Sequence, residues 1–180
     1  GLAPAIYDLV GKYNDVPAYK LFGPKIRSRV PMASWTVSQT PTKMAEEIEH
    51  AAKAGYTWLK YHTNHFHNVI AQTEAMQAVA PPGFKIHYDL NFDNTVEHVL
   101  ELARELVKYP IAGAIEDPLR THDFEGHRSL RSKCPLPIYF HHLKLGGREA
   151  MLGLAEGYML GQAPVGQVIQ RAGLIEAANV

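Results

Sequence analysis

Apolar residues recur along this chain in two alternating patterns. Short apolar runs that end in a polar residue alternate with longer stretches in which apolar residues return every three or four positions. The first pattern is typical of buried strands and the second of amphipathic helices. The runs that predict strands are 29–36, 56–62, 84–91, 111–118, 136–142 and 157–164. Strands that alternate with helices in this way predict βαβ units and a parallel sheet.

Two of the helical stretches carry recognisable start signals. Thr40 before Pro41 predicts a helix that begins at Pro41, because proline is favoured at the first helical position. Asn94 with Glu97 three residues later predicts a capping box at the start of the helix after the third strand. Both signals follow a predicted strand directly, which supports the alternation of strands and helices.

The polar residues at the ends of the first five strands are evenly spaced. They are separated by 26, 27, 27 and 26 residues and are Thr36, His62, Asp89, Glu116 and His142. Such a period is typical of a (β/α) barrel, in which the carboxyl ends of the strands converge on the face that holds the active site. The sequence therefore predicts a partial TIM (β/α) barrel in the α/β class, with about six of the eight βα units present.

Composition narrows the class of protein. The 180 residues include 18 basic and 18 acidic side chains and a single cysteine, Cys134. Zero net charge gives no sign of a nucleic-acid or membrane partner, and one cysteine excludes an internal disulfide and a cysteine-cluster metal site. No apolar run approaches the roughly 18 to 20 residues of a membrane span, and the N-terminus does not resemble a signal peptide. We therefore expect a cytoplasmic enzyme.

Three strand-end residues have the chemistry of metal ligands. Asp89, Glu116 and His142 would meet at the mouth of the barrel and suit a divalent cation. Two carboxylates favour Mg²⁺, whereas the imidazole shifts the preference toward Mn²⁺, Fe²⁺ or Zn²⁺. In the alternative interpretation, Asp89 and Glu116 cap the following helices or form ion pairs with Lys60.

Lys60 and His62 are the candidate catalytic residues. They lie two apart on one predicted strand, so both side chains point to the same face. If that face is the barrel interior, they are candidates for a general base and its electrostatic partner; alternatively, Lys60 forms a structural ion pair. His65 and His67 in the following loop form a second histidine group, which we expect to be exposed.

On these motifs the chain resembles the enolase superfamily, and within it the mandelate racemase/muconate lactonizing enzyme group. Residues 6–23 are similar to the segment that leads from the capping domain of that group into its barrel. AAKAGYTWLKYH (51–62) is similar to its second strand with the Lys-x-Lys motif, YDLN (88–91) to its Asp-x-Asn and IEDP (115–118) to its Glu-Glu-Pro. Residues 122–138 are similar to its run into the fifth strand.

The resemblance assigns domains and metal ligands. It implies that 1–28 links a missing capping domain to the barrel and that 29–180 forms strands 1–6 of the barrel. Asp89 and Glu116 match the first two metal ligands of the group. His142 falls where the group has a Glu as its third ligand. The resemblance implies Mg²⁺ as the cofactor.

The resemblance also assigns residues that contact the substrate. Asn91 matches a substrate-binding Asn, and we expect Lys144 to bind substrate as well. Lys60 matches the first Lys of the Lys-x-Lys pair, but His62 stands where the group has the second Lys, its usual base. The sixth strand lacks the Asp that the group carries there.

The reaction that the resemblance implies is metal-assisted removal of a proton α to a carboxylate. We expect an acid-sugar dehydratase, racemase or epimerase that acts on a small carboxylate substrate and forms a homo-oligomer. A noncatalytic paralogue or fragment without metal is the alternative, because the Lys base and the third acidic ligand are replaced. A metal hydrolase that uses the histidine loop is a third hypothesis.

Overall fold

A computed structural model describes residues 2–63, 66–143, 145–161 and 163–179. By their contacts the residues divide into two units, Gly1–Met32 and Ala33–Val180. The first unit holds helix α1 (Leu2–Tyr13) and the short 3₁₀ helix η1 (Ala18–Leu21). Tyr7 and Phe22 pack edge to face within it, with their ring centroids 4.6 Å apart. The role of 1–28 as a linking segment stays a prediction.

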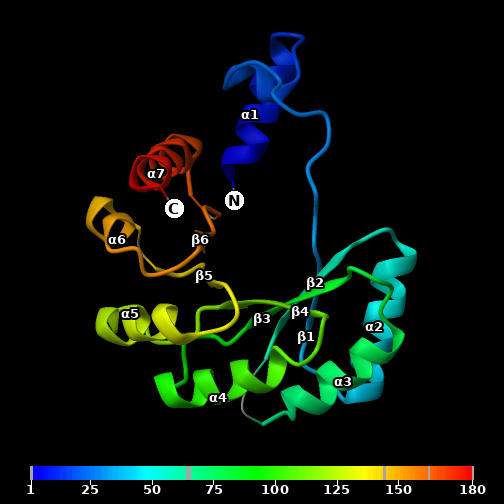
Figure 1. Ribbon diagram of the computed structural model, residues 1–180. Helices are drawn as coiled ribbons and strands as arrows, with labels where there is room; N and C mark the ends of the chain where they lie inside the picture. Colours follow the sequence, from blue (N-terminus) through cyan, green and yellow to red (C-terminus); the bar gives the residue numbers. More distant parts are fainter. Residues whose placement is uncertain (1, 64–65, 144, 162, 180) are drawn as a thin grey trace. The chain divides into compact units, whose positions relative to one another are not determined.

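The second unit contains a single sheet with interleaved helices (Figure 1). Its strands are β1 (Ser34–Val37), β2 (Trp58–His62), β3 (Lys85–Asp89), β4 (Ala112–Glu116), β5 (Ile138–Phe140) and β6 (Gly157–Tyr158). Its helices are α2 (Pro41–Lys53), α3 (Val69–Val79), α4 (Val96–Leu106), α5 (Phe124–Lys133), α6 (Gly147–Met151) and α7 (Val165–Ala178). The strands follow one another in sequence order, and every pairing is parallel. The predicted parallel order is therefore confirmed.

The starts of α2 and α4 show one correct and one incorrect capping prediction. The Thr40 hydroxyl accepts from the backbone N–H of Lys43, and Pro41 takes the first helical position, as predicted. In α4 the cap is Thr95, whose hydroxyl accepts from the N–H of His98. The Asn94 amide instead donates to the Leu90 carbonyl in the turn after β3. The predicted capping box at Asn94 was therefore wrong by one residue, because that turn already uses the Asn94 side chain.

Alternation along the strands separates the core from the candidate site. In β2 and β3 the apolar side chains of Leu59, Tyr61, Ile86 and Tyr88 are buried in one cluster with residues of α2, α3 and α4. Successive strand residues point to opposite faces, so Lys60, His62, His87 and Asp89 lie on the other face of the sheet. The register pairs His62 with Asp89 and Asp89 with Glu116. The polar ends of β2, β3 and β4 are thus immediate neighbours.

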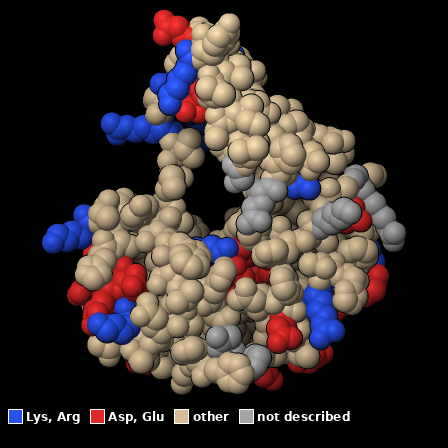
Figure 2. All heavy atoms as spheres, turned by 180° about the vertical axis from the view of Figure 1, so that it is seen from behind, with Lys and Arg blue, Asp and Glu red and all other residues tan. Residues whose placement is uncertain are grey.

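One face of the molecule shows how the charged side chains are distributed. On the face seen in Figure 2, basic and acidic side chains are interspersed among the described residues, without a continuous patch of either sign. In the part of the chain that the structure describes, no helix combines the length and apolar character needed to cross a membrane.

Candidate active site

Three carboxylates meet at the carboxyl ends of β3 and β4. Asp89 is the last residue of β3, Glu116 is the last residue of β4, and Asp117 follows it directly. Oxygen atoms of the three lie within 4.8 Å of one another. Asp89 and Glu116 are 0% exposed and Asp117 is 1% exposed. Because carboxylates repel one another and burial disfavours their charge, this group needs positive charge nearby.

Lys60 supplies part of that charge. Its Nζ lies 2.8 Å from Glu116 Oε1 and 3.0 Å from Asp89 Oδ2. The ion pairs of the alternative interpretation are therefore present. Burial opposes the charge of Lys60, but Glu116 and Asp89 outweigh burial and raise the pKa of Lys60 above its ordinary value. Among the described residues, Lys60 is the only Lys or Arg that pairs with the three carboxylates, so its single charge balances them only in part.

Histidines surround the carboxylates. His62 Nε2 lies 3.0 Å from Asp89 Oδ2, and His87 Nε2 lies 2.9 Å from Glu116 Oε2. His141 Nδ1 lies 3.2 Å from Glu116 Oε1. Burial alone would raise the pKa of Glu116, but the contacts from His87 and Lys60 outweigh it and lower the pKa of Glu116 to about 2. Glu116 is therefore an ionised carboxylate at neutral pH.

Several buried atoms of this group lack a well-formed hydrogen bond. Asp89 Oδ2, Glu116 Oε2, His87 Nε2 and His141 Nδ1 are buried, and their short contacts do not have hydrogen-bond geometry. Buried polar atoms of this kind indicate a missing partner. Carboxylate oxygens and imidazole nitrogens are common ligands of divalent cations. The negative charge of the carboxylates that Lys60 does not balance would also attract a cation. The residues present fit a divalent cation.

The third predicted ligand, His142, lies beside this group rather than in it. Its Nδ1 is 2.6 Å from Asp117 Oδ2, and its ring packs edge to face on Phe92. Among the described residues, Asp117 joins two sets of possible ligand atoms, one with Asp89 and Glu116 and one with the two histidines. Among the described residues no such set unites His142 with Asp89 and Glu116, so the side chains do not by themselves bring the three expected ligands together.

The backbone after β5 explains this arrangement. β5 ends at Phe140, and the N–H groups of His141 and His142 both donate to the Asp117 carboxylate. This turn directs the His141 ring toward Glu116 and leaves the His142 side chain 47% exposed. The ligand roles of Asp89, Glu116 and His142 stay predictions.

Comparison with known proteins identifies the family. Residues 43–143 match the family described as Enolase C-terminal domain-like. The chain belongs to this family.

Relatives of this enolase-family chain include sugar-acid dehydratases. D-galactonate dehydratase of Verminephrobacter eiseniae is 28% identical over 149 residues, in a match that covers 77% of this chain and 38% of the relative. Arabinonate dehydratase of Saccharolobus solfataricus is 27% identical over 143 residues, with the same coverage. D-gluconate dehydratase of Thermoproteus tenax is 27% identical over 168 residues, which are 85% of this chain and 33% of the relative. These matches thus span about a third of the length of each relative.

Solved structures of the family show the same fold. A mandelate racemase/muconate lactonizing family protein from Azoarcus sp. EbN1 superposes with a TM-score of 0.84 at 26% identity, over 98% of this chain and 49% of that one. A dipeptide epimerase from Enterococcus faecalis, complexed with Mg and a dipeptide, superposes with a TM-score of 0.83 at 21% identity, over 97% of this chain and 51% of that one. The parallel sheet is therefore part of a TIM barrel, as predicted, and the chain spans about half of these structures.

Of the two predicted substrate-binding residues, Asn91 and Lys144, the structure describes only Asn91. Asn91 adopts a left-handed backbone conformation (φ 51°) directly after β3, and its N–H donates to Asp89 Oδ1 at 3.0 Å. Its amide nitrogen donates to the Thr63 carbonyl at 3.2 Å, which ties the loops after β2 and β3 together. Lys144 and His65 lie outside the described residues.

Two residues of the site, His87 and Asp117, were not among those predicted from the enolase-family motifs. His87 lies two residues before Asp89 on β3. Because side chains alternate along a strand, this spacing was enough to predict that His87 and Asp89 point to the same face of the sheet. Asp117 is the acidic residue after Glu116 in the IEDP motif. Its left-handed conformation (φ 45°), which brings its carboxylate to both groups, could not be foreseen from the sequence.

Proposed function

We propose that this chain is part of an enzyme that removes the proton α to the carboxylate of a small acid-sugar substrate with the help of a divalent cation. The reaction would be that of a dehydratase, a racemase or an epimerase. The observation that carries the proposal is the group of three buried carboxylates at the ends of β3 and β4, whose charge Lys60 balances only in part. Sugar-acid dehydratases among the relatives support the substrate class.

Asp89 and Glu116 are the proposed ligands of the cation, with His142 as the third. A divalent cation at this place supplies positive charge that stabilises the negative charge developing on the substrate carboxylate. Mg²⁺ is the cofactor that the family resemblance favours, and an imidazole ligand extends the choice to Mn²⁺, Fe²⁺ or Zn²⁺. His141 is the rival for the third position, because its Nδ1 is 3.2 Å from Glu116.

Proposed roles in proton transfer follow from the positions of Lys60 and His62. Lys60 carries two short ion pairs and a raised pKa, which suits a permanent positive charge rather than a base. The His62 side chain is 40% exposed; it contacts Asp89, and its ring lies perpendicular to the Trp35 ring with the centroids 5.5 Å apart. His62 is therefore the proposed general base, because a neutral imidazole accepts a proton near neutral pH. We propose that Asn91 and Lys144 help to bind the substrate.

Exchange of the α-proton in heavy water tests this proposal directly. The protein is incubated in D₂O with Mg²⁺ or Mn²⁺ and with D-galactonate, D-gluconate or arabinonate, and proton NMR follows the α-position and any dehydrated product. We expect Glu116→Gln to lower the exchange rate by at least about a hundredfold, because it removes a charged ligand. The control is Glu105→Gln, which changes an exposed carboxylate paired with Lys108 on α4.

A noncatalytic barrel is the second candidate, and one observation favours it. The Lys60 ammonium already lies within 3.0 Å of both Asp89 and Glu116, where it stabilises them without a metal. This candidate predicts that wild-type protein binds no divalent cation and exchanges no α-proton. Exchange with any of the three sugar acids that Glu116→Gln abolishes would contradict it.

A further inference from the structure

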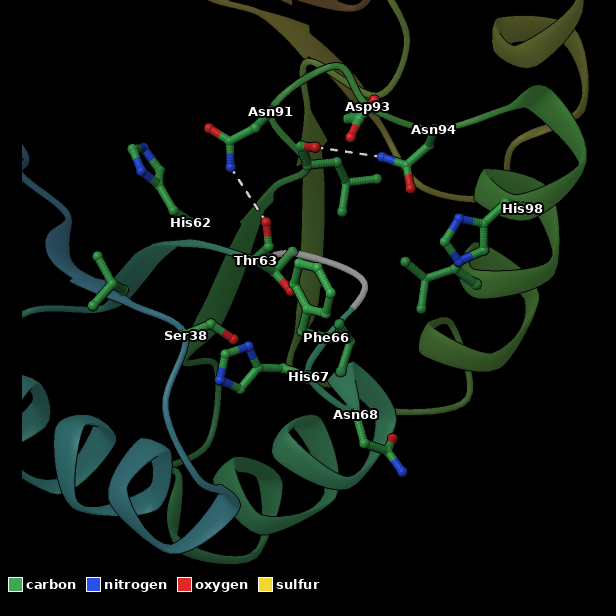
Figure 3. Close-up of a pocket in the computed structure, with 14 residues that line it drawn as sticks. Ser38, His62, Thr63, Phe66, His67, Asn68, Asn91, Asp93, Asn94 and His98 are labelled. Atoms are coloured by element: carbon green, nitrogen blue, oxygen red, sulfur yellow. Dashed lines mark hydrogen bonds between the residues drawn. The ribbon is translucent and has the colours of Figure 1, made fainter.

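Two residues in the loops after β3 and β4 adopt backbone conformations that are unfavourable for their side chains. Phe92 (φ 51°) and Asp117 (φ 45°) both lie in the left-handed region, where a bulky residue such as Phe is rarely found. The Phe92 N–H donates to the Asp117 carbonyl at 2.6 Å, which joins the two loops. Asn91, which precedes Phe92, is held by its bond to the Thr63 carbonyl (Figure 3). Strained conformations of this kind cluster at functional sites, where the surrounding structure holds them in place.

These two loops meet at the imidazole ring of His142. Nδ1 of His142 lies 2.6 Å from Asp117 Oδ2. The Phe92 ring stands nearly perpendicular to the His142 ring, with the centroids 5.1 Å apart, and the His141 ring lies with its centroid 4.2 Å away. The His142 side chain is 47% exposed, so these three neighbours, rather than burial in the core, set its orientation.

The contact with Asp117 gives the two ring nitrogens of His142 different roles. A carboxylate only accepts hydrogen bonds, so Nδ1 of a neutral His142 carries the proton. Nε2 then keeps its lone pair, and in the described part of the chain no hydrogen bond or ion pair engages it. Histidine ligands of metals commonly show this arrangement, in which one nitrogen binds the cation and the N–H of the other donates to a carboxylate. His141 differs, because its Nδ1 faces Glu116.

We propose that Asp117 and Phe92 are positioning residues that orient His142 so that Nε2 is the nitrogen available to the cation. The inference rests on the proposed function, in which His142 is the third ligand, and deepens it by naming the ligand atom and the residues that select it. Asp117 also offers an oxygen within 4.8 Å of ligand atoms of Asp89 and Glu116, so the ring that it orients borders the proposed metal site. A cation bound to all three ligands requires His142 to move toward Asp89 and Glu116, and the bond from Nδ1 to Asp117 leaves Nε2 as the binding atom.

Nitrogen NMR of the imidazoles tests the orientation without a metal or a substrate. Long-range proton–nitrogen spectra at about pH 8, where imidazoles are neutral, distinguish protonated from unprotonated ring nitrogens. We expect wild-type His142 to carry its proton on Nδ1, and the signals that disappear in His142→Gln give the assignment. Asp117→Asn should lower the population of this tautomer, because an amide N–H can donate to Nδ1. The control Asp93→Asn makes the same change at an exposed residue next to Phe92 and should leave the tautomer unchanged.

The same spectra test the role of Phe92. Phe92→Leu removes the aromatic ring but keeps an apolar side chain, whereas Phe92→Tyr keeps the ring. We expect Phe92→Leu to broaden or duplicate the His142 signals, because the imidazole takes more than one orientation without the ring. Phe92→Tyr should match wild type. A purely structural role of Phe92 predicts a lower thermal midpoint in Phe92→Leu without any change in the His142 signals.

Titration with Zn²⁺ tests the ligand atom. Added Zn²⁺ should shift the Nε2 resonance of His142 while Nδ1 stays protonated. Asp117→Asn should weaken Zn²⁺ binding about ten- to a hundredfold, which is the usual cost of changing the partner of a histidine ligand. In the His142→Gln background the same change should cost little more, because Asp117 acts through His142.

The inference is overturned if wild-type His142 carries its proton on Nε2, if Asp117→Asn leaves the tautomer unchanged, or if Zn²⁺ shifts the nitrogens of His141 alone. An equal loss of Zn²⁺ affinity from Asp117→Asn in both backgrounds would also contradict it, because Asp117 would then bind the cation itself. Failure of the proposed function gives a different pattern, with no cation binding and no α-proton exchange. If Asp117→Asn still changed the tautomer of His142 in that case, the orienting role of Asp117 would be supported and the proposed function refuted.

Discussion

The carboxyl ends of β3 and β4 place their polar residues differently from the carboxyl end of β5. β3 and β4 each continue as a strand to the acidic residue, and the register pairs Asp89 with Glu116. β5 ends at Phe140, before His141 and His142, and these two histidines follow a turn around Asp117. A side chain within a strand takes its direction from the pleat, whereas one beyond the strand takes it from the turn that follows. The first can be predicted from spacing and the second cannot.

The two regions also differ in electrostatics. Asp89 and Glu116 are fully buried, and each has several positive or polar neighbours. The His142 side chain is 47% exposed and contacts one carboxylate. Changes at the β3–β4 ends should therefore have large effects on stability, while changes at the β5 end should mainly alter the choice of metal.

The largest effect is expected for Lys60→Met. This change leaves Asp89 and Glu116 buried without their cation and should lower the free energy of unfolding by about 3–5 kcal/mol in metal-free buffer. Added Mn²⁺ or Mg²⁺ should restore part of the loss, because a bound cation replaces the ammonium charge. Urea unfolding with and without the cation measures both effects.

The matched control is Lys108→Met, which breaks an exposed pair with Glu105 and should change stability by less than about 1 kcal/mol. Equal losses for Lys60→Met and Lys108→Met would contradict the claim that the β3–β4 ends hold unbalanced charge.

The next largest effect is expected on the stability of the fold at low pH, where Glu116 becomes protonated. Its pKa is lowered from 4.5 to about 2 in the folded protein, so its ionised form stabilises the fold above pH 4.5. This contribution is lost as pH falls from about 4.5 through about 2. We expect the stability of wild type to fall more steeply over this range than that of Glu116→Gln, which has no group to protonate. Parallel stability curves for the two proteins would show that Glu116 is not held ionised by its neighbours.

Site residues that lie within a strand could be predicted from the sequence, whereas those beyond a strand end could not. The even period placed His62, Asp89 and Glu116 on one face, and strand alternation added Lys60. Both predictions held because β2, β3 and β4 continue as paired strands up to these residues. The period also included His142, but β5 is shorter than the predicted 136–142, so the last residues do not follow the pleat. The cap at Thr95 was missed by one residue for a similar local reason, since the turn after β3 uses the Asn94 amide. Turn geometry, rather than periodicity, decided both cases.

A smaller effect tests which histidine at the β5 end takes the third ligand position. His142→Glu adds a negative charge and should raise Mg²⁺ affinity roughly tenfold, because Mg²⁺ prefers carboxylate ligands. His141→Glu is the matched comparison from the adjacent residue. A larger gain for His141→Glu would assign the position to His141, in agreement with its contact to Glu116. Equal Mg²⁺ affinity in both variants and wild type would remove the β5 end from the metal site.

Binding of Mn²⁺ followed by electron paramagnetic resonance tests the central claim most directly. Wild-type protein, Asp89→Asn and the control Asp8→Asn, which alters an exposed residue paired with Lys12, are titrated with Mn²⁺. Loss of a charged ligand should weaken binding about a hundredfold in Asp89→Asn, whereas Asp8→Asn should match wild type. Nitrogen couplings in the wild-type spectrum would identify an imidazole ligand. Identical titration curves for all three proteins would contradict the account, because the carboxylates at the ends of β3 and β4 would then hold no metal.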